Sequence, residues 1–375
     1  MFIRKIGKRI EEAIDGERKV IIIYGPRQAG KTTLIKALLD GGDKKYEYFT
    51  GDDLYAQSVF GKNELESLKK VLHDDIVVID EAQKIENIGL SLKLMFDNLS
   101  MKIIASGSAS FDLANKLNEP LTGRTKTFWV YPMAYAEIKD KYKKTLPETS
   151  LEEMLLFGMY PKVQTLENNK GKEDYLYEYL NNYLHKDILA FDGVRKPKKV
   201  VDLLTLLALQ IGKEVSISEL AQNLSMSQKT VENYLDILEK MFVIVNLRGF
   251  SRNLRKEISK TSKYYFMDTG IRNALIRNFN PLLLRSDFGE LFENWFIIEK
   301  IKAANIFEKP ANFYFWRTYD QQEIDLIEER DGKLFGYEIK FKNKAVKPVA
   351  DWLETYENAS FEVVHKENYQ NFLSE

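Results

Sequence analysis

One nine-residue stretch restricts the folds open to this chain more than any other feature. Gly-Pro-Arg-Gln-Ala-Gly-Lys-Thr-Thr fills residues 25–33, after the apolar run Val20–Tyr24 and before the helical pattern Leu34–Leu39. A strand, a glycine-rich turn and a helix with the spacing GxxxxGK[ST] are typical of a phosphate-binding loop. The alternative is a chance glycine loop, and the flanking strand and helix argue against it. We therefore predict an α/β domain built on a parallel sheet.

The residue types in this stretch explain how it would bind a nucleotide. Gly25 and Gly30 let the backbone turn so that successive N–H groups point at one phosphate chain, and the following helix adds partial positive charge. Lys31 is expected to reach the β- and γ-phosphates, and Thr32 to place its hydroxyl on Mg²⁺. The expected nucleotide-binding residues are Gly25, Pro26, Arg27, Gln28, Ala29, Gly30, Lys31, Thr32, Thr33 and Asp80.

A second apolar run, Ile76–Ile79, ends in the carboxylates Asp80 and Glu81. Such a run predicts a strand buried on both faces of a parallel sheet, and its C-terminal end would face the same crevice as the phosphate loop. Asp80 is placed to hold Mg²⁺, and Glu81 to polarise the water that attacks the γ-phosphate. The extra strand and the second carboxylate favour a hydrolysing ATPase over a small kinase, with Lys31 and Glu81 as catalytic residues.

Two further segments supply candidate sensors of the γ-phosphate. Ser106 and Ser108 end a predicted strand, and either could bind the phosphate or simply form a turn. Arg124 follows Gly123 and could reach a phosphate in its own or in a neighbouring subunit, or form a surface salt bridge. We take Ser108 and Arg124 as the catalytic candidates of this group.

These motifs resemble those of the AAA-type ATPases common in archaea and bacteria. The resemblance lies in Gly-Pro-Arg-Gln-Ala-Gly-Lys-Thr-Thr-Leu, Ile-Asp-Glu-Ala-Gln-Lys, Ser-Gly-Ser-Ala-Ser, Leu-Thr-Gly-Arg, Tyr-Pro-Met-Ala-Tyr-Ala-Glu and Leu-Phe-Gly-Met-Tyr-Pro. It covers nearly the whole chain and implies ATP and Mg²⁺ as cofactors, with a poorly characterised C-terminal region. It also implies that Gln83 belongs to the nucleotide-sensing set. The chain departs from the family at Met159 and Lys186, near which glycine and arginine are usual.

The composition fits a globular protein of two or three domains, since the chain has 375 residues with 44% hydrophobic and 30% charged side chains. The net charge of -1 gives no overall attraction to nucleic acid, so such contacts have to come from local patches. There is no cysteine, and the three histidines are far apart. No stretch reaches the roughly 18–20 apolar residues of a membrane span. We expect a cytoplasmic protein, without a membrane partner, that could form a homo-oligomer.

Four regions are predicted along the chain. We place an AAA-type ATPase core at residues 1–145, a helical lid or linker at 146–195, a winged helix-turn-helix at 196–277 and a restriction-endonuclease-like domain at 278–375. The winged helix is predicted from a short helix that begins at Ser218, a second helix that is capped by Ser227 and runs to Lys240, and two wing strands.

The winged helix offers two kinds of partner. Gln228, Lys229 and Asn233 would line the exposed face of the second helix. Basic residues gather between the wing strands, opposed only by Glu257: Arg248, Arg252, Arg255, Lys256, Lys260 and Lys263. This set could contact the phosphates of DNA or RNA, but winged helices also serve as protein-binding modules.

The C-terminal region contains an acid on one predicted strand and Glu-x-Lys on the next. Alternation along strands puts Glu338 and Lys340 on one face, beside Asp325 if the strands pair. With Glu293 on the preceding helix, this pattern resembles the restriction-endonuclease-like core. The resemblance implies a possible second metal site at Asp325 and Glu338, with Glu293 and Lys340 nearby. Ile324 stands where the nuclease-like core usually has a proline before the aspartate. Whether this domain cleaves nucleic acid is left open, because some relatives with this core serve only as binding modules.

The sequence thus predicts an ATP-driven switch that acts on nucleic acid through its C-terminal region. Two alternatives remain: an ATP-regulated, metal-dependent nuclease, and a signalling or assembly ATPase with protein partners only.

Overall fold

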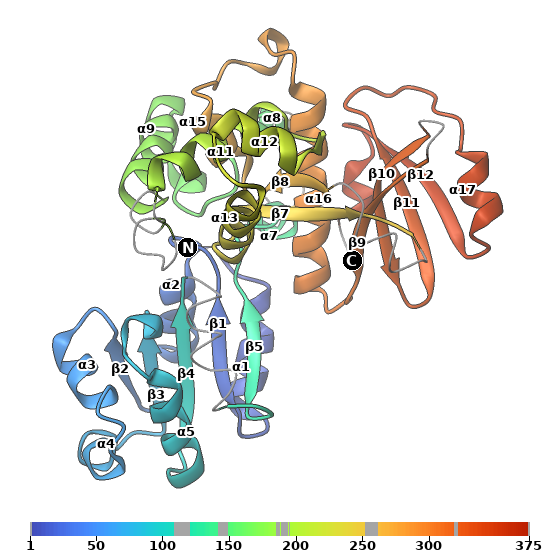
Figure 1. Ribbon diagram of the computed structural model, residues 1–375. Helices are drawn as coiled ribbons and strands as arrows, with labels where there is room; N and C mark the ends of the chain where they lie inside the picture. Colours follow the sequence, from blue (N-terminus) through green and yellow to red (C-terminus); the bar gives the residue numbers. More distant parts are fainter. Residues whose placement is uncertain are drawn as a thin grey trace. The chain divides into compact units, whose positions relative to one another are not determined.

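The computed structural model describes residues 2–108, 121–141, 149–184, 188, 194, 196–251, 262–318 and 322–373. The chain divides into two compact units (Figure 1). The first comprises Met1–Met133 and Lys240–Phe242, and the second comprises Ala134–Glu239 and Val243–Glu375. Each unit is described by itself.

The first unit is built on a five-stranded, fully parallel sheet with the order β2-β3-β4-β1-β5 (Figure 1). The strands are β1 (Val20–Tyr24), β2 (Tyr46–Thr50), β3 (Ile76–Asp80), β4 (Lys102–Gly107) and β5 (Thr125–Trp129). Every residue of β1 and β3 is buried, as their continuous apolar runs predict for strands covered on both faces.

Helices cover both faces of this sheet. On one face α1 (Ile6–Asp15) and α2 (Lys31–Leu39) pack against Ile21 and Ile23. On the other face three helices pack against Val20 and Ile22, the alternate residues of the same strand. These helices are α3 (Leu54–Phe60), α4 (Leu65–Val71) and α5 (Ile88–Asn98), and a short 3₁₀ turn, η1 (Ala82–Lys84), follows β3.

The second unit contains a mixed seven-stranded sheet with the order β12-β11-β10-β9-β7-β8-β6 (Figure 1). Its strands are β6 (Glu214–Val215), β7 (Ile244–Gly249), β8 (Ser262–Phe266), β9 (Asn312–Arg317), β10 (Glu323–Arg330), β11 (Lys333–Ile339) and β12 (Ala359–Val364). A short parallel pairing of Arg248 and Gly249 with Tyr314 and Phe315 joins β7 to β9. One sheet therefore runs through both the predicted winged helix and the predicted nuclease-like region.

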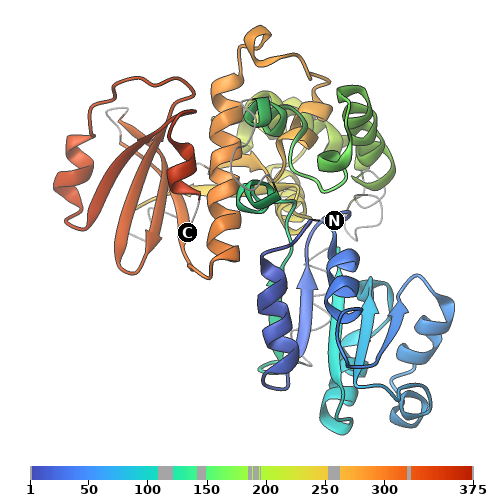
Figure 2. The same ribbon diagram turned by 180° about the vertical axis from the view of Figure 1, so that it is seen from behind.

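The helices of the second unit are α7 (Tyr135–Lys141), α8 (Thr149–Phe157), α9 (Asn169–Tyr179), α11 (Pro197–Leu209), α12 (Ile217–Leu224), α13 (Gln228–Lys240), α15 (Thr269–Leu275), α16 (Phe288–Ile306) and α17 (Ala350–Thr355). The short turns are η2 (Val163–Thr165), η3 (Leu180–Leu184), η4 (Leu282–Leu284) and η5 (Tyr369–Phe372). Ser227 accepts a hydrogen bond from the Thr230 N–H over 3.2 Å, so it caps α13 as predicted. The long helix α16, in orange in Figure 2, packs against β8. There the side-chain amide of Asn294 exchanges two hydrogen bonds with the Phe266 backbone.

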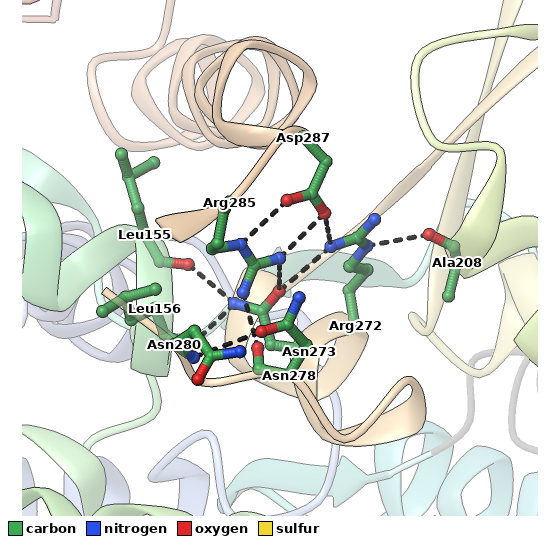
Figure 3. A network of polar contacts seen from close by, with 9 residues as sticks. All are labelled: Leu155, Leu156, Ala208, Arg272, Asn273, Asn278, Asn280, Arg285 and Asp287. Carbon is green, nitrogen blue, oxygen red and sulfur yellow. Dashed lines mark hydrogen bonds and ion pairs between the residues drawn. The ribbon is translucent and has the colours of Figure 1, made fainter. Parts of the chain in front are cut away.

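Two buried arginines share one carboxylate in the helical part of the second unit (Figure 3). Arg285 donates two hydrogen bonds of 2.8 Å to Asp287, and Arg272 donates one of 2.5 Å. Arg272 also reaches the Ala208 carbonyl on α11, at 2.8 Å. Asn273 donates to two carbonyls of α8 over 2.8 and 3.0 Å. The network therefore ties α8, α11, α15 and the start of α16 together.

A second set of buried hydrogen bonds holds the Leu-Phe-Gly-Met-Tyr-Pro stretch at residues 156–161 in place. The buried side chain of Asp268 accepts hydrogen bonds from the N–H groups of Met159, at 2.6 Å, and Ile271, at 3.2 Å. Gly158 lies against this carboxylate with φ +74°, and a Cβ there would come within 2.0 Å of Asp268 Oδ1. Only glycine fits this close approach.

Candidate functional site

The predicted phosphate loop connects β1 to α2 in the first unit. Gly30 precedes α2 with φ 94° and ψ 22°, a left-handed conformation that glycine adopts without strain. Gly25 is required for a different reason, because a Cβ there would lie 1.9 Å from the Val130 carbonyl oxygen. The two glycines of the motif thus serve a turn and a close backbone contact.

Lys31 lies inside this loop rather than in solvent. Its side chain is 5% exposed, and Nζ donates to the carbonyls of Gly25 and Pro26 over 2.8 and 2.9 Å. The ammonium group is therefore held at the centre of the loop, where an anion bound by the backbone N–H groups would meet it.

Asp80 meets the loop at the C-terminal end of β3. Its Oδ2 accepts from the hydroxyls of Thr32, at 2.5 Å, and Tyr48, at 2.6 Å. Its Oδ1 accepts from the Ser106 hydroxyl and from the Glu81 N–H, at 3.0 Å. Burial raises the pKa of Asp80, but these hydrogen bonds outweigh it and hold the pKa below its usual value. The carboxylate is therefore charged, and a hydroxyl and a carboxylate side by side fit the oxygen ligands that Mg²⁺ prefers.

Glu81 forms a separate set of contacts. Gln83 Nε2 donates to Glu81 Oε2 over 2.6 Å and to the Ser108 hydroxyl over 3.1 Å, and that hydroxyl lies 3.4 Å from the same glutamate oxygen. The two serines at the end of β4 thus divide their contacts, Ser106 with Asp80 and Ser108 with Glu81. The sequence identified both serines but could not assign a partner to either.

The structure does not bring Arg124 to the loop of its own chain. Its carbonyl accepts from the Val20 N–H over 2.8 Å, so it lies where β1 begins, roughly 17 Å along the strand from Gly25. Its Nε pairs with Asp97 at 3.1 Å on the surface. A sensing role within the same chain is therefore not supported, because the turn before a parallel strand lies at the edge opposite the phosphate loop.

The second unit brings the four predicted residues of the C-terminal site together. Lys340 Nζ lies 2.6 Å from Glu338 Oε1 and 3.5 Å from Asp325 Oδ2. The Ile339 N–H donates to the same Asp325 oxygen over 2.7 Å. Burial, followed by the charge of Asp325, raises the pKa of Glu293 on α16 to about 8. The carboxylates are thus close enough to affect one another.

Lys263 also belongs to the charged cluster formed by Glu293, Asp325, Glu338 and Lys340, and the sequence did not reveal this. Its side chain is 3% exposed, forms an ion pair with Glu323 and lies 4.0 Å from Glu293. Tyr265, two residues later on the same face of β8, donates to Glu293 over 2.6 Å. The prediction that Lys263 belongs to an exposed basic patch is therefore wrong. Arg248 is exposed, and the patch residues Arg252, Arg255, Lys256 and Lys260 lie outside the described residues.

The second metal site at Asp325 and Glu338 stays a prediction. Within the part of the chain that the structure describes, no group of three or more Asp, Glu, His or Cys side chains is arranged to hold a metal ion. Lys263 and Lys340 instead neutralise part of the negative charge. Burial also raises the pKa of both Asp325 and Glu338.

Comparisons with known proteins divide the chain into three matched regions. Residues 17–139 match the AAA domain, residues 148–282 match a domain of unknown function (DUF8612), and residues 288–372 match another (DUF4143). An uncharacterised protein of Mycobacterium tuberculosis is 30% identical over 328 residues, which cover 86% of this chain and 70% of that protein. The chain belongs to this family of AAA-domain proteins.

Other members and a solved structure agree with this assignment. An uncharacterised protein of Methanocaldococcus jannaschii is 26% identical, with coverage of 76% of this chain and 69% of its own length. The Walker-type ATPase PABY2304 of Pyrococcus abyssi has the same fold at 19% identity, with a TM-score of 0.52 over 74% of this chain and 96% of its own. An AAA domain implies nucleotide binding. None of the described helices is both long and apolar enough to cross a membrane.

Proposed function

We propose that the first unit binds ATP together with Mg²⁺ and hydrolyses it. The observation that carries this proposal is the direct contact of Thr32 with Asp80 beside a loop that already holds Lys31 at its centre. In P-loop ATPases these three residue types serve the phosphates and the metal ion. The match of residues 17–139 to the AAA domain supports the same activity.

Each residue then has a defined task. Lys31 exchanges the carbonyls of Gly25 and Pro26 for phosphate oxygens when nucleotide binds. Thr32 and Asp80 would hold Mg²⁺, which neutralises charge on the phosphates when bound. Glu81 orients the attacking water and accepts its proton. Ser108 and Gln83 keep the Glu81 carboxylate in place.

ATP turnover by the purified chain and by Lys31→Ala tests this function. We expect the substitution to abolish hydrolysis, because the loop loses its only ammonium group. Lys69→Ala, which alters an exposed lysine on α4 paired with Glu66, is the matched control and should turn over ATP like the parent. Wild-type turnover by Lys31→Ala would overturn the assignment.

We propose that ATP hydrolysis switches the second unit, for which nucleic acid is the first candidate target. The helices α12 and α13 with the antiparallel pair β7 and β8 have the order of a winged helix, which supports residues 196–277 as that domain. Arg248 is exposed, and the sequence that follows it is rich in arginine and lysine. Binding of labelled duplex DNA and of RNA at increasing salt tests this target, because phosphate contacts weaken steeply with salt.

A protein partner is the second candidate, and the surface of α13 favours it. The exposed residues of this helix are Gln228, Lys229, Glu232, Asn233 and Asp236. They include one positive and two negative charges. The two carboxylates would be repelled by the phosphate backbone if this helix lay in a DNA groove. The second candidate would be favoured if the chain did not bind nucleic acid, or if its binding did not change with the salt concentration.

The helices and strands of residues 278–375 follow the order expected for a nuclease-like domain, and we retain this domain as a proposal. We also retain residues 146–195 as a proposed helical lid. Cleavage of nucleic acid is not proposed, because among the described residues no group of three or more acidic, histidine or cysteine side chains forms a metal site around Asp325 and Glu338. Arg124 could act only on the nucleotide of a neighbouring subunit, so its catalytic role depends on a homo-oligomer.

A further inference from the structure

Tyr48 is a residue of the nucleotide site that neither the sequence motifs nor the family resemblance marks. It lies in the middle of the edge strand β2, opposite Val78 of β3. Its ring is partly buried against the cluster beneath α1 and α2, and its hydroxyl donates to Asp80 Oδ2 over 2.6 Å. Oδ2 is also the oxygen that the Thr32 hydroxyl contacts, at 2.5 Å.

We propose that Tyr48 is a positioning residue, which holds the Asp80 carboxylate toward Thr32 and thereby sets the affinity of the site for Mg²⁺ with nucleotide. This inference rests on the proposed ATPase function.

Hydrogen-bond donors occupy the acceptor directions of the Asp80 carboxylate. A carboxylate offers about four lone-pair directions, and four donors meet Asp80: Thr32, Tyr48, Ser106 and the Glu81 N–H. The torsion that turns a carboxylate is soft, so its orientation depends on its hydrogen bonds. Without Tyr48, Thr32 is the one remaining donor at Oδ2, and Thr32 is itself needed by the metal ion. Loss of such outer partners typically weakens metal affinity about 10-fold to 100-fold.

The competing explanation is that the ring of Tyr48 merely fills space. The ring also lies beneath the Lys36 ammonium group, whose Nζ is 4.8 Å from the ring centroid. Tyr48→Phe separates these roles, because it keeps the ring and removes only the hydroxyl. Tyr46→Phe is the matched control: Tyr46 lies on the same face of β2, and its hydroxyl bonds to the exposed Asp40 over 2.5 Å.

The experiment titrates a non-hydrolysable ATP analogue into the full chain, once in EDTA and once over a range of Mg²⁺ concentrations. For Tyr48→Phe we expect parent-like affinity in EDTA, but about a 10-fold higher Mg²⁺ concentration for half-maximal enhancement of binding. Tyr46→Phe should match the parent in both series. Thermal unfolding without nucleotide checks that each variant is folded.

Two results would overturn the inference: the same Mg²⁺ requirement in Tyr48→Phe as in the parent, or an equal loss of affinity with and without Mg²⁺. The second would show that Tyr48 acts on the nucleotide pocket in general. Failure of the proposed function is recognised separately, because the parent chain itself would then bind no analogue, and the inference would fall with it.

Discussion

Gln83 Nε2 donates a hydrogen bond to Glu81 Oε2 over 2.6 Å. The glutamate that we propose as general base is thus held by a neighbour only two residues away. Its backbone is also in the left-handed region, with φ 48° and ψ 39°, where a residue other than glycine is rarely found. The two adjacent carboxylates have different side-chain partners, Asp80 with Thr32 and Glu81 with Gln83, so they can serve different tasks.

The first prediction concerns Glu81. Glu81→Gln should retain binding of ATP with Mg²⁺ and lose hydrolysis by about 10²–10⁴-fold, because the amide cannot accept a proton from water. Nucleotide titration and phosphate release measured on the same sample check both parts. Turnover within a few-fold of the parent would assign the base to another group.

Gly158 provides a prediction about stability. Gly158→Ala should destabilise the second unit by more than about 1 kcal/mol, because the new Cβ meets Asp268 and φ is positive. Gly289→Ala is the control, since no atom lies within 4 Å of its Cβ position. Gly289 is near the start of α16, and alanine there should stabilise by up to about 1 kcal/mol. Urea unfolding of both variants measures the difference, and equal stabilities would contradict the geometry.

The carboxylate shared by the two arginines predicts a pH dependence. Burial raises the pKa of Asp287, but Arg285 and Arg272 outweigh this and lower it to about 2, from an ordinary 3.8. A lowered pKa means that the contacts of the Asp287 carboxylate with the two arginines stabilise the folded state by about 2 kcal/mol above about pH 4. This contribution is lost as the pH falls toward 2.

Asp287→Asn tests this contribution. At pH 7 it should lower the free energy of unfolding by about 3–5 kcal/mol, because two buried arginines lose their counter-charge. The difference from the parent should shrink between pH 4 and pH 2, as the parent carboxylate takes up its proton. A difference that stays constant over this range would show that Asp287 is not the titrating group.

Lys263 and Arg248 form a natural pair for comparison, because they lie on adjacent paired strands, one buried and one exposed. Lys263→Ala should destabilise the second unit by about 1–3 kcal/mol, since it removes the buried cation that pairs with Glu323. Arg248→Ala should change stability by less than about 0.5 kcal/mol. If nucleic acid binds, Arg248→Ala should reduce the salt dependence of binding. A folded variant that lacks the Lys263 charge should leave this salt dependence unchanged, because Lys263 is buried.

The sequence was sufficient to bring the predicted phosphate loop and Asp80 together. Val20–Tyr24 and Ile76–Asp80 are apolar enough to mark buried parallel strands, and the carboxyl ends of parallel strands share one edge. The contact between Thr32 and Asp80 follows from these two facts. The same rule, applied to Arg124, would have placed it at the other edge, because it precedes a strand instead of following one.

Other features depend on contacts that no local pattern encodes. The pairing of β7 with β9 joins residues more than sixty positions apart over only two residue pairs, which leaves no periodic signal. Lys263 lies in a run of basic residues that reads as solvent-exposed, and its burial follows from the approach of α16 to β8. Tyr48 looks like an ordinary strand residue until β3 is placed beside it.

The position of β7 between β8 and β9 bears on how this protein can change in evolution. Because β7 pairs with β8 on one edge and with β9 on the other, a recombination break between the two matched regions, at residues 283–287, would leave β7 on one fragment and β9 on the other without the two residue pairs that join them. Exposed edges of this kind promote aggregation. We therefore expect the two C-terminal regions to be inherited as one block, whereas the AAA domain has a sheet of its own and could be exchanged without opening either sheet.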